Sequence, residues 1–417
     1  MKKSVRPTAP SLTSELWAKV FAHLELPQKN GSWDYFDQRQ QQARLHQLKL
    51  VCKQFREVFT SHPALVQQLY ISSDFCVRAL PSLLAWLHQS KNSVQYFQSE
   101  CRSPLVDAVV SGLVSPQPSL KSVSIRDISV CSLSLLAAFT RLETCSLWNA
   151  KEERLDLTPL QGLPRLTHLS LGGQFMQLHH LVGLTHLQCV GASVLGVRKF
   201  ALTLQHLEIK HSTLRDIDTR GLSTCPALTH LELNNVCLVL DTREGYLDRN
   251  LTLVPANVRW LTHLHTLHLY TGTNVCTAAV NLDWVYTLTT LQDLSITLNR
   301  HSQEGAIMDA SMLTNLTCLS VLGVRDNCGI GPLLNIAIDW YRLHAPQCLA
   351  ICDCRLVLDV EIAGLLQLQH LKEITLEGIV TCNEENTGLL VAFTNNLARR
   401  RPQVELSLDC AIPWKTF

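Results

Sequence analysis

The stretch LTHLSLGGQFMQLHHLVGLTHLQC (166–189) contains one six-residue phrase twice, at its start and at its end. The phrase is L-x-x-L-x-L, and a histidine, His168 or His186, occupies its third position. Because side chains alternate along a strand, the fourth and sixth positions share one face and the third and fifth share the other. One strand cannot bury its leucines, but a stack of such strands builds a continuous core. The stretch therefore predicts a repeat protein with parallel strands.

Copies of this phrase run through most of the 417-residue chain. Close copies begin at Leu120, Leu142, Leu204, Leu228, Leu264, Leu291, Leu316 and Leu371, and looser copies begin at Val66, Lys91, Cys348 and Arg401. Their mean spacing of about 26 residues lies in the range of leucine-rich repeats, roughly 20–29 residues. The chain thus resembles the leucine-rich-repeat family. This resemblance implies an α/β fold, a horseshoe solenoid with parallel strands, which we expect to span 66–417.

The segments between the phrases must return the chain to the start of the next strand. SLSLLAAF (132–139) and TGLLVAFTNNLARR (387–400) have helical character. Long helical returns are typical of the ribonuclease-inhibitor-like branch of the family, which this chain resembles. In the family, asparagine or cysteine usually closes the turn at the ninth position of the repeat. Only Asn299 matches that pattern here.

Composition excludes several classes of protein. Leucine accounts for 75 residues, the net charge is +1 and charged residues make up 17%, below the roughly 25% of an ordinary soluble domain. A near-neutral balance gives no electrostatic footprint for nucleic acid or for an anionic membrane surface. No window approaches the roughly 18 uninterrupted apolar residues of a membrane helix. We therefore expect neither nucleic acid nor a membrane as partner.

The sixteen cysteines lie scattered along the chain and form no C-x-x-C pair. The first residues, MKKSVRPTAPSLTSELW (1–17), have no apolar region of the kind that a secretory signal requires. We therefore interpret the cysteines as reduced thiols that act as small buried apolar groups. The expected localisation is cytoplasmic, nuclear or both.

Residues 10–65 do not follow the repeat pattern, and residues 1–9 are expected to be disordered. SLTSELWAKVFAHL (11–24) and LHQLKLVCKQFREVF (45–59) each place apolar residues on one helical stripe. The segment resembles an F-box, with LVCKQFREV (50–58) as its most similar part. In that family, the apolar faces of the helices bind a Skp-type adaptor, which links the chain to a cullin. The residues that the resemblance assigns to adaptor binding are Leu12, Leu16, Val20, Phe21, Leu24, Leu48, Val51, Cys52 and Phe55. The same stripes also fit a helical cap on the first repeat.

The outward positions of the repeats hold the candidate residues for binding a protein substrate. The third position reads His168, His186, His206 and His230 in four consecutive copies, on strands expected to lie roughly 4.7–4.9 Å apart. The full candidate set is His168, His186, His206, Glu208, His230, Glu232, His268 and Asp293. Histidine simply suits a half-exposed strand position. Alternatively, the histidines form a docking surface that weakens as pH falls through about 6.5.

A second grouping, His344, Cys348, Cys352 and Cys354, has a spacing unlike that of structural zinc sites, and we interpret it as buried core. No nucleophile elbow, phosphate loop or dinucleotide fingerprint is present. We therefore expect no catalytic residues, no cofactor and no metal. The sequence favours a non-catalytic substrate-recognition subunit of a Skp–cullin–F-box ubiquitin ligase. A scaffold or a regulatory binding protein without a ubiquitin role is the alternative.

Overall fold

The computed structural model describes residues 67–411 with gaps. The longest undescribed segments within this range are 192–202, 216–224, 240–260, 271–279, 299–305, 324–332, 338–346, 357–369 and 382–391. The chain divides into two compact units, one formed by 1–146 with 162–165 and the other by 147–161 with 166–417. The sequence-based boundary between 65 and 66 lies at the edge of the described residues and stays a prediction.

The first unit combines three parallel strands with helical returns. Strand β1 (Gln68–Ile71) pairs with β2 (Tyr96–Ser99), and β2 pairs with β3 (Ser122–Ile125). Their returns contain the 3₁₀ turn η2 (Val77–Ala79) and the helices α4 (Leu80–Ser90), α5 (Ser103–Leu113) and α6 (Val130–Leu136). Ser129 caps α6 by accepting a hydrogen bond from the backbone N–H of Ser132 at 3.0 Å, which satisfies one of the unpaired donors at the helix start.

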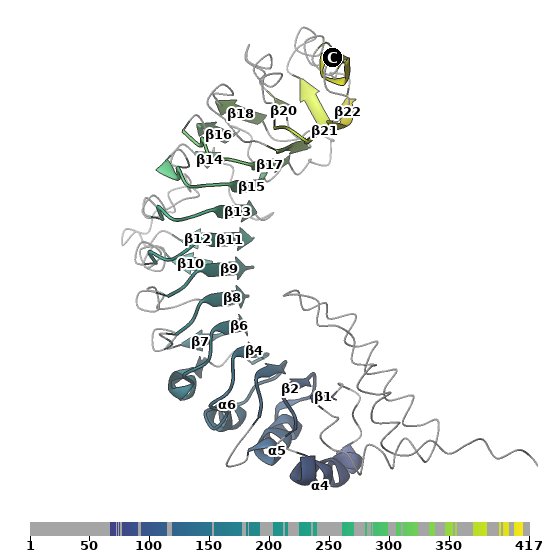
Figure 1. Cartoon of the computed structure of the whole chain (residues 1–417). Coiled ribbons are helices and arrows are strands. Elements are labelled where there is room, and N and C mark those ends of the chain that lie inside the picture. The colour runs from purple at the N-terminus through teal and green to yellow at the C-terminus, as the bar shows by residue number, and fades with distance from the viewer. Residues whose placement is uncertain are drawn as a thin grey trace, which may run out of the picture. The chain divides into compact units, whose positions relative to one another are not determined.

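The second unit is dominated by a ladder of parallel strands, one for each repeat (Figure 1). Strand β4 (Thr144–Trp148) contains the boundary between the units. The ladder consists of β6 (His168–Gly172), β8 (His186–Val190), β9 (His206–Lys210), β11 (His230–Asn234), β13 (Thr266–Tyr270), β15 (Asp293–Leu298), β17 (Cys318–Gly323), β19 (Cys348–Cys352), β21 (Glu373–Thr381) and β22 (Glu405–Ala411). Each strand pairs with the next, third position beside third position.

The pairing corrects three of the looser repeat assignments. Tyr96 pairs with Gln68 and with Ser122, so this copy begins at 94 and not at Lys91. Cys348 pairs with Cys318, which places the start at 346. Glu405 pairs with Glu373, so the last copy begins at 403 and not at Arg401. In these copies Val94, Pro346 and Gln403 replace the first leucine, so the first position of the phrase does not mark where the copy begins.

The core of the second unit is a continuous stack of aliphatic side chains. At the fourth position of the phrase, side chains that contact water at no more than 2% of their surface follow one another from strand to strand. These are Leu169, Leu187, Leu207, Leu231, Leu267 and Leu294. Cys189 takes the sixth position and is fully buried, as the interpretation of the cysteines as small apolar groups predicts, whereas Cys131 on α6 is exposed and does not fit it. Leucine therefore supplies most of the fourth-position core among the described strands of this unit.

The return segments are not uniformly helical, contrary to our expectation. Helix α6 and residues 395–399 confirm helical returns near 132–139 and 387–400. Between β4 and β21, the described returns contain η3 (Thr158–Gly162) and the short strands β5 (Leu155–Asp156), β7 (Phe175–Met176), β10 (Thr213–Arg215), β12 (Cys237–Val239), β14 (Val280–Asn281), β16 (Ala306–Asp309), β18 (Leu333–Ala337) and β20 (Arg355–Leu356). These strands pair in parallel as β5–β7, as β10–β12, and in the order β14, β16, β18, β20. Among the described residues, no helix combines the length and apolarity that crossing a membrane requires.

In four successive described repeats, the residue that closes the turn after the ladder strand occupies the eighth position of the repeat, and not the ninth. Gly173, Gly191 and His211 occupy it with φ values of +92°, +62° and +49°. In the preceding repeat the same position is Asn149, whose buried side chain accepts from the backbone N–H of Lys151 at 3.0 Å and donates to a backbone carbonyl. Glycine and histidine tolerate a positive φ better than most residues do, whereas Asn149 closes its turn through side-chain hydrogen bonds and not through a positive φ.

Gly173 and Gly191 provide a matched pair for testing this turn. A Cβ on Gly173 would lie 2.2 Å from the backbone oxygen of Asn149, whereas a Cβ on Gly191 would meet nothing within 4 Å. Both alanine variants strain the backbone, but only Gly173→Ala also forces two strands apart. We expect Gly173→Ala to lower the free energy of unfolding by about 1–2 kcal/mol more than Gly191→Ala does. Urea unfolding of both variants measures the difference, and equal losses would contradict the assigned clash.

Candidate functional site

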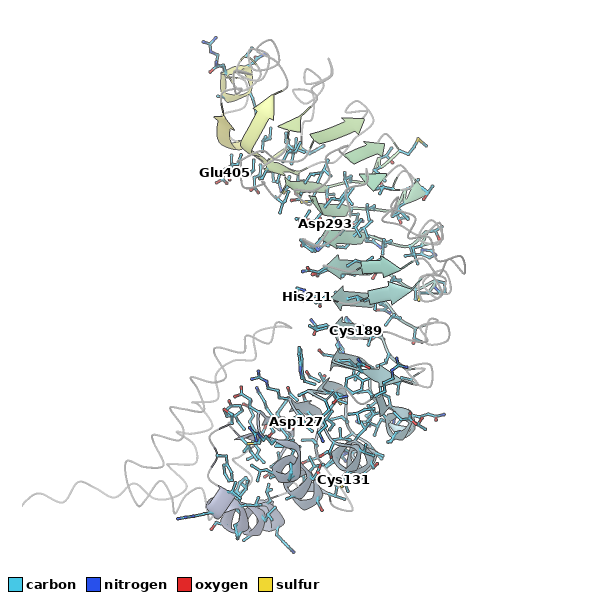
Figure 2. All side chains as sticks on the ribbon, turned by 180° about the vertical axis from the view of Figure 1, so that it is seen from behind. Asp127, Cys131, Cys189, His211, Asp293 and Glu405 are labelled. Carbon is cyan, nitrogen blue, oxygen red and sulfur yellow. The ribbon has the colours of Figure 1, made fainter. Side chains whose placement is uncertain are left out.

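The candidate adaptor-binding residues, from Leu12 to Phe55, lie outside the described residues. The candidate substrate-binding residues all lie in the second unit, on the outward face of its ladder. Figure 2 shows Asp293 and Glu405 at this face, on strands far apart in the ladder. The pairing therefore brings together, on one surface, residues that are separated by more than a hundred positions in the sequence.

Four histidines form a stack at the third position, which we call the histidine ladder: His168, His186, His206 and His230. The ring centroids of the first pair are 4.1 Å apart, those of the second 5.4 Å and those of the third 3.9 Å. The interplanar angles are 11°, 21° and 7°, so that the rings lie nearly parallel. The strand spacing produces this arrangement, because identical positions on parallel strands repeat at a distance that suits stacked rings.

The surroundings of the histidine ladder favour neutral rings. Burial lowers the pKa of His186, His206 and His230, and neighbouring histidines lower it further. The effect is largest at His206, whose pKa falls to about 4 even though Glu208 opposes the shift. Nδ1 of His168 and Nδ1 of His186 lie 2.8 and 2.9 Å from the hydroxyls of the preceding threonines. His186, His206 and His230 are therefore protonated below the range near pH 6.5 that the sequence suggested.

A hydrogen-bonded chain of polar side chains runs beside the histidine ladder at the fifth position. Ser170 donates to Gln188 at 2.7 Å, and Gln188 donates from Nε2 to Oε2 of Glu208 at 2.8 Å. Lys210 pairs with Glu208 and, at 3.4 Å, with Oε1 of Glu232. Because the carboxylates are only 13% and 18% exposed, these ion pairs are less screened than ordinary surface pairs. These hydrogen bonds and ion pairs hold polar side chains of four consecutive strands in place.

Lys210 was missed by the sequence analysis. Although burial opposes it, the two glutamates raise the pKa of Lys210, which keeps the lysine charged. It occupies the seventh position, one residue beyond the L-x-x-L-x-L phrase. The strands of the second unit extend to that position, so it also belongs to the outward face. A basic residue two positions after Glu208 was the signal that could have identified it.

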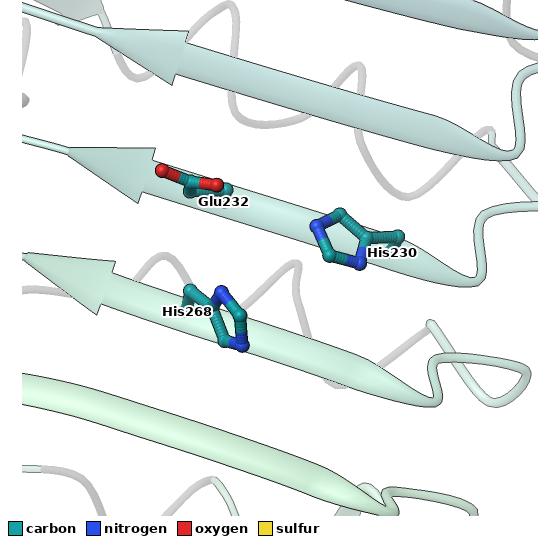
Figure 3. Close-up of side chains that lie close together, drawn as sticks. All are labelled: His230, Glu232 and His268. Atoms are coloured by element: carbon teal, nitrogen blue, oxygen red, sulfur yellow. The ribbon is translucent and has the colours of Figure 1, made fainter. Parts of the chain in front are cut away.

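At the end of the histidine ladder, its last member His230 lies close to Glu232 and His268, where β11 meets β13 (Figure 3). His268 is the direct neighbour of Glu232 in the ladder, and its ring meets that of His230 edge-on, with centroids 5.5 Å apart. Nε2 of His268 lies 3.3 Å from Oδ2 of Asp293 on β15. The hydrogen bond to Asp293 raises the pKa of His268, which separates it from the histidine ladder. The sequence predicted these residues individually but not their convergence.

Towards the C-terminal end of the ladder, the third position changes from histidine to thiol and carboxylate. Cys318 and Cys348 are register partners, and Glu373 and Glu405 continue the row. Burial, together with Asp293 and Cys348, raises the pKa of Cys318 to about 12. Cys348 and Cys352 face outward and are half-buried, which corrects our interpretation of them as core. His344 and Cys354 lie outside the described residues.

No protein-family model and no curated protein matches the sequence. Among solved structures, the chain is similar to a leucine-rich-repeat protein of Leptospira interrogans, at 14% identity over 86% of this chain and 92% of that one, with a TM-score of 0.44. It is also similar to an internalin, InlF, of Listeria monocytogenes, at 14% identity over 88% of each chain, with a TM-score of 0.46.

The fold follows from the chain itself. Each repeat contributes one parallel strand, and each strand pairs with the next through its third position, above a core of leucines. This arrangement defines the leucine-rich-repeat class. The described strands form a leucine-rich-repeat solenoid. Its core consumes the apolar positions, so the differences between repeats accumulate on the outward face.

Proposed function

We propose that the chain is a non-catalytic protein-binding subunit that holds a protein substrate on the outward face of the second unit. The observation that carries this proposal is the ordered row of stacked histidines beside Glu208, Lys210 and Glu232. Rigid strands present this surface, and its hydrogen bonds fix the side chains before a partner arrives. Binding therefore costs little side-chain ordering.

The chemical character of the face supports a protein partner. Rings of histidine and Tyr270 supply planar contact area, and the glutamates and Lys210 supply charge at defined positions. Protein interfaces combine such anchors with a polar surround. A near-zero net charge of +1 argues against a nucleic-acid partner.

More specifically, we propose that the chain is the substrate-recognition subunit of a Skp–cullin–F-box ubiquitin ligase in the cytoplasm, the nucleus or both. The support is the resemblance of residues 10–65 to an F-box, followed directly by repeats that can hold a substrate. The first segment would attach the chain to a Skp-type adaptor and so to a cullin. The contribution to catalysis would then be proximity, because the substrate is held near the ubiquitin-loaded enzyme.

Two other functions fit the same solenoid. The chain could act as a scaffold for assembly, with residues 10–65 covering the end of the solenoid, or as a regulator that binds an enzyme. Both use the outward face, and neither needs a Skp-type adaptor. Adaptor binding therefore distinguishes the ligase subunit from both alternatives.

Binding of the full-length chain to a purified Skp-type adaptor tests this proposal. We expect direct binding by the wild type and loss of at least about tenfold in affinity when Leu16 and Val20 are both replaced by aspartate, since each tenfold change needs only about 1.4 kcal/mol. His186→Gln, on the outward face of the solenoid, is the matched control and should bind the adaptor like the wild type. Absence of binding by a folded wild-type chain would refute the ligase role and leave the scaffold and the regulator.

A further inference from the structure

We propose that His230, Glu232 and His268 bind one Zn²⁺ ion on the outward face of the solenoid, with Asp293 orienting His268. The site is independent of the ubiquitin-ligase role, because it depends only on residues of the second unit. It also differs from the cysteine grouping around Cys348, which lies four strands of the ladder away from β11.

The backbone places the three ligands with little freedom. His230 and Glu232 are two residues apart on β11, so both side chains project from the same face. His268 is held beside Glu232 by the register of β13. One ligand atom from each residue lies within 4.8 Å of the other two. Zinc bonds of about 2.0–2.2 Å require closer ligand atoms, which small rotations about the side-chain bonds provide.

The ligand set suits zinc rather than a hard cation. Imidazole nitrogens prefer zinc and neighbouring transition metals, whereas calcium and magnesium prefer oxygen alone. Two histidines and one carboxylate leave the fourth position of a tetrahedral zinc ion open to water.

Asp293 supplies the second element that such sites contain. Its carboxylate lies 3.3 Å from Nε2 of His268, so that Nε2 donates and Nδ1 carries the lone pair of the neutral ring. A carboxylate that holds one nitrogen of a ligating histidine fixes the ring and strengthens the other nitrogen as a ligand. Asp293 thus acts as a positioning residue for this site.

Lys210 opposes the metal and therefore offers a sharp test. Its ammonium group lies 3.4 Å from Oε1 of Glu232 and repels a cation placed there. Because Oε1 of Glu232 is paired with Lys210, the metal would bind Oε2 of the same carboxylate. Removing the lysine charge with Lys210→Met should strengthen zinc binding, while an unrelated loss of structure would weaken it.

Calorimetric titration with ZnCl₂ of the full-length protein, stripped of metal with a chelator and kept reduced, measures the site. We expect one ion per chain at this site, at least about tenfold weaker binding in His230→Gln, Glu232→Gln and His268→Gln, and roughly tenfold weaker binding in Asp293→Asn. Lys210→Met should bind severalfold more tightly. His186→Gln, which removes a histidine of the ladder outside the site, should bind like the wild type.

Co²⁺ in place of Zn²⁺ separates this site from the cysteines. Cobalt held by two histidines and a carboxylate shows no sulfur-to-metal charge-transfer band, and this is the spectrum that we expect for the tightest-binding ion. A thiolate band at the first equivalent would overturn the proposal. Equal zinc affinity in the wild type and in His268→Gln would overturn it too, as would an equal loss in His186→Gln. Circular dichroism of each variant confirms that the chain remains folded.

Discussion

Replacing Leu231 by alanine is expected to lower the free energy of unfolding by about 2–5 kcal/mol. Leu231 is fully buried on β11, and its register partners Leu207 and Leu267 are fully buried on either side. The substitution removes apolar contacts and leaves a cavity that two neighbouring repeats share. Because each repeat of a solenoid is stabilised mainly by its neighbours, the loss weakens both interfaces at once.

Urea unfolding followed by circular dichroism measures this loss. Met312→Ala is the control, since Met312 belongs to the same unit but is 44% exposed. Its effect should stay within about 0.5 kcal/mol. Leu231→Ala with the stability of the control would show that the strands do not share one core.

Acidification from pH 7 to pH 4 is expected to destabilise the protein, with about 2 kcal/mol of the loss due to His206. Its pKa of about 4 lies below the ordinary value of 6.5, so the unfolded chain takes up this proton at higher pH than the folded chain does. The contribution of His206 to the free energy of unfolding is fully present above about pH 6.5 and is lost as pH falls towards 4. One pKa unit corresponds to about 1.4 kcal/mol, and partial exposure of the ring reduces the total.

The groups around His206 determine how this loss develops. His186 and His230 face it from the two neighbouring strands, and both have a lowered pKa, so they add to the loss. Glu208, on the same strand, raises the pKa of His206 and so reduces the loss of stability. His268 also opposes it, because its raised pKa gives a contribution that is present at acid pH and lost as pH rises.

Urea unfolding at several pH values, in buffer with a chelator, tests the histidine ladder. His206→Gln should flatten the decrease in stability between pH 6.5 and pH 4. His88→Gln, which replaces an exposed histidine on α4, should leave the decrease unchanged. A decrease of the same size in the wild type and in His206→Gln would contradict the role of the histidine ladder.

The sequence predicted the strands wherever the leucines were intact. From 166 to 321, every close copy of the phrase became a strand with its third position in register, because burial of one face permits only one register. At 94, 346 and 403 the first leucine of the phrase is replaced, so the starts of these copies are not marked in the sequence. Only the pairing with neighbouring strands resolves them.

The return segments and the site were harder to predict, for physical reasons. Pairs such as β14 with β16 are held by hydrogen bonds between segments distant in the sequence, and short apolar runs do not reveal them. The histidine row was visible because one position repeats. The convergence of His230, Glu232 and His268 depends on two positions on adjacent strands, and Lys210 lies beyond the repeated phrase.

The short strands on the return side determine how strongly the second unit can bend. Neighbouring parallel strands lie about 4.7–4.9 Å apart, whereas packed helices need about 8–10 Å. A repeat with a helix on its return side is wider there than at its ladder strand, and the stack must curve. From β14 to β20 the return side also consists of paired strands with the ordinary strand spacing, so the width of packed helices is not what curves the stack there. A partner bound along this part of the second unit would therefore meet strands that repeat at one spacing on both sides of the solenoid.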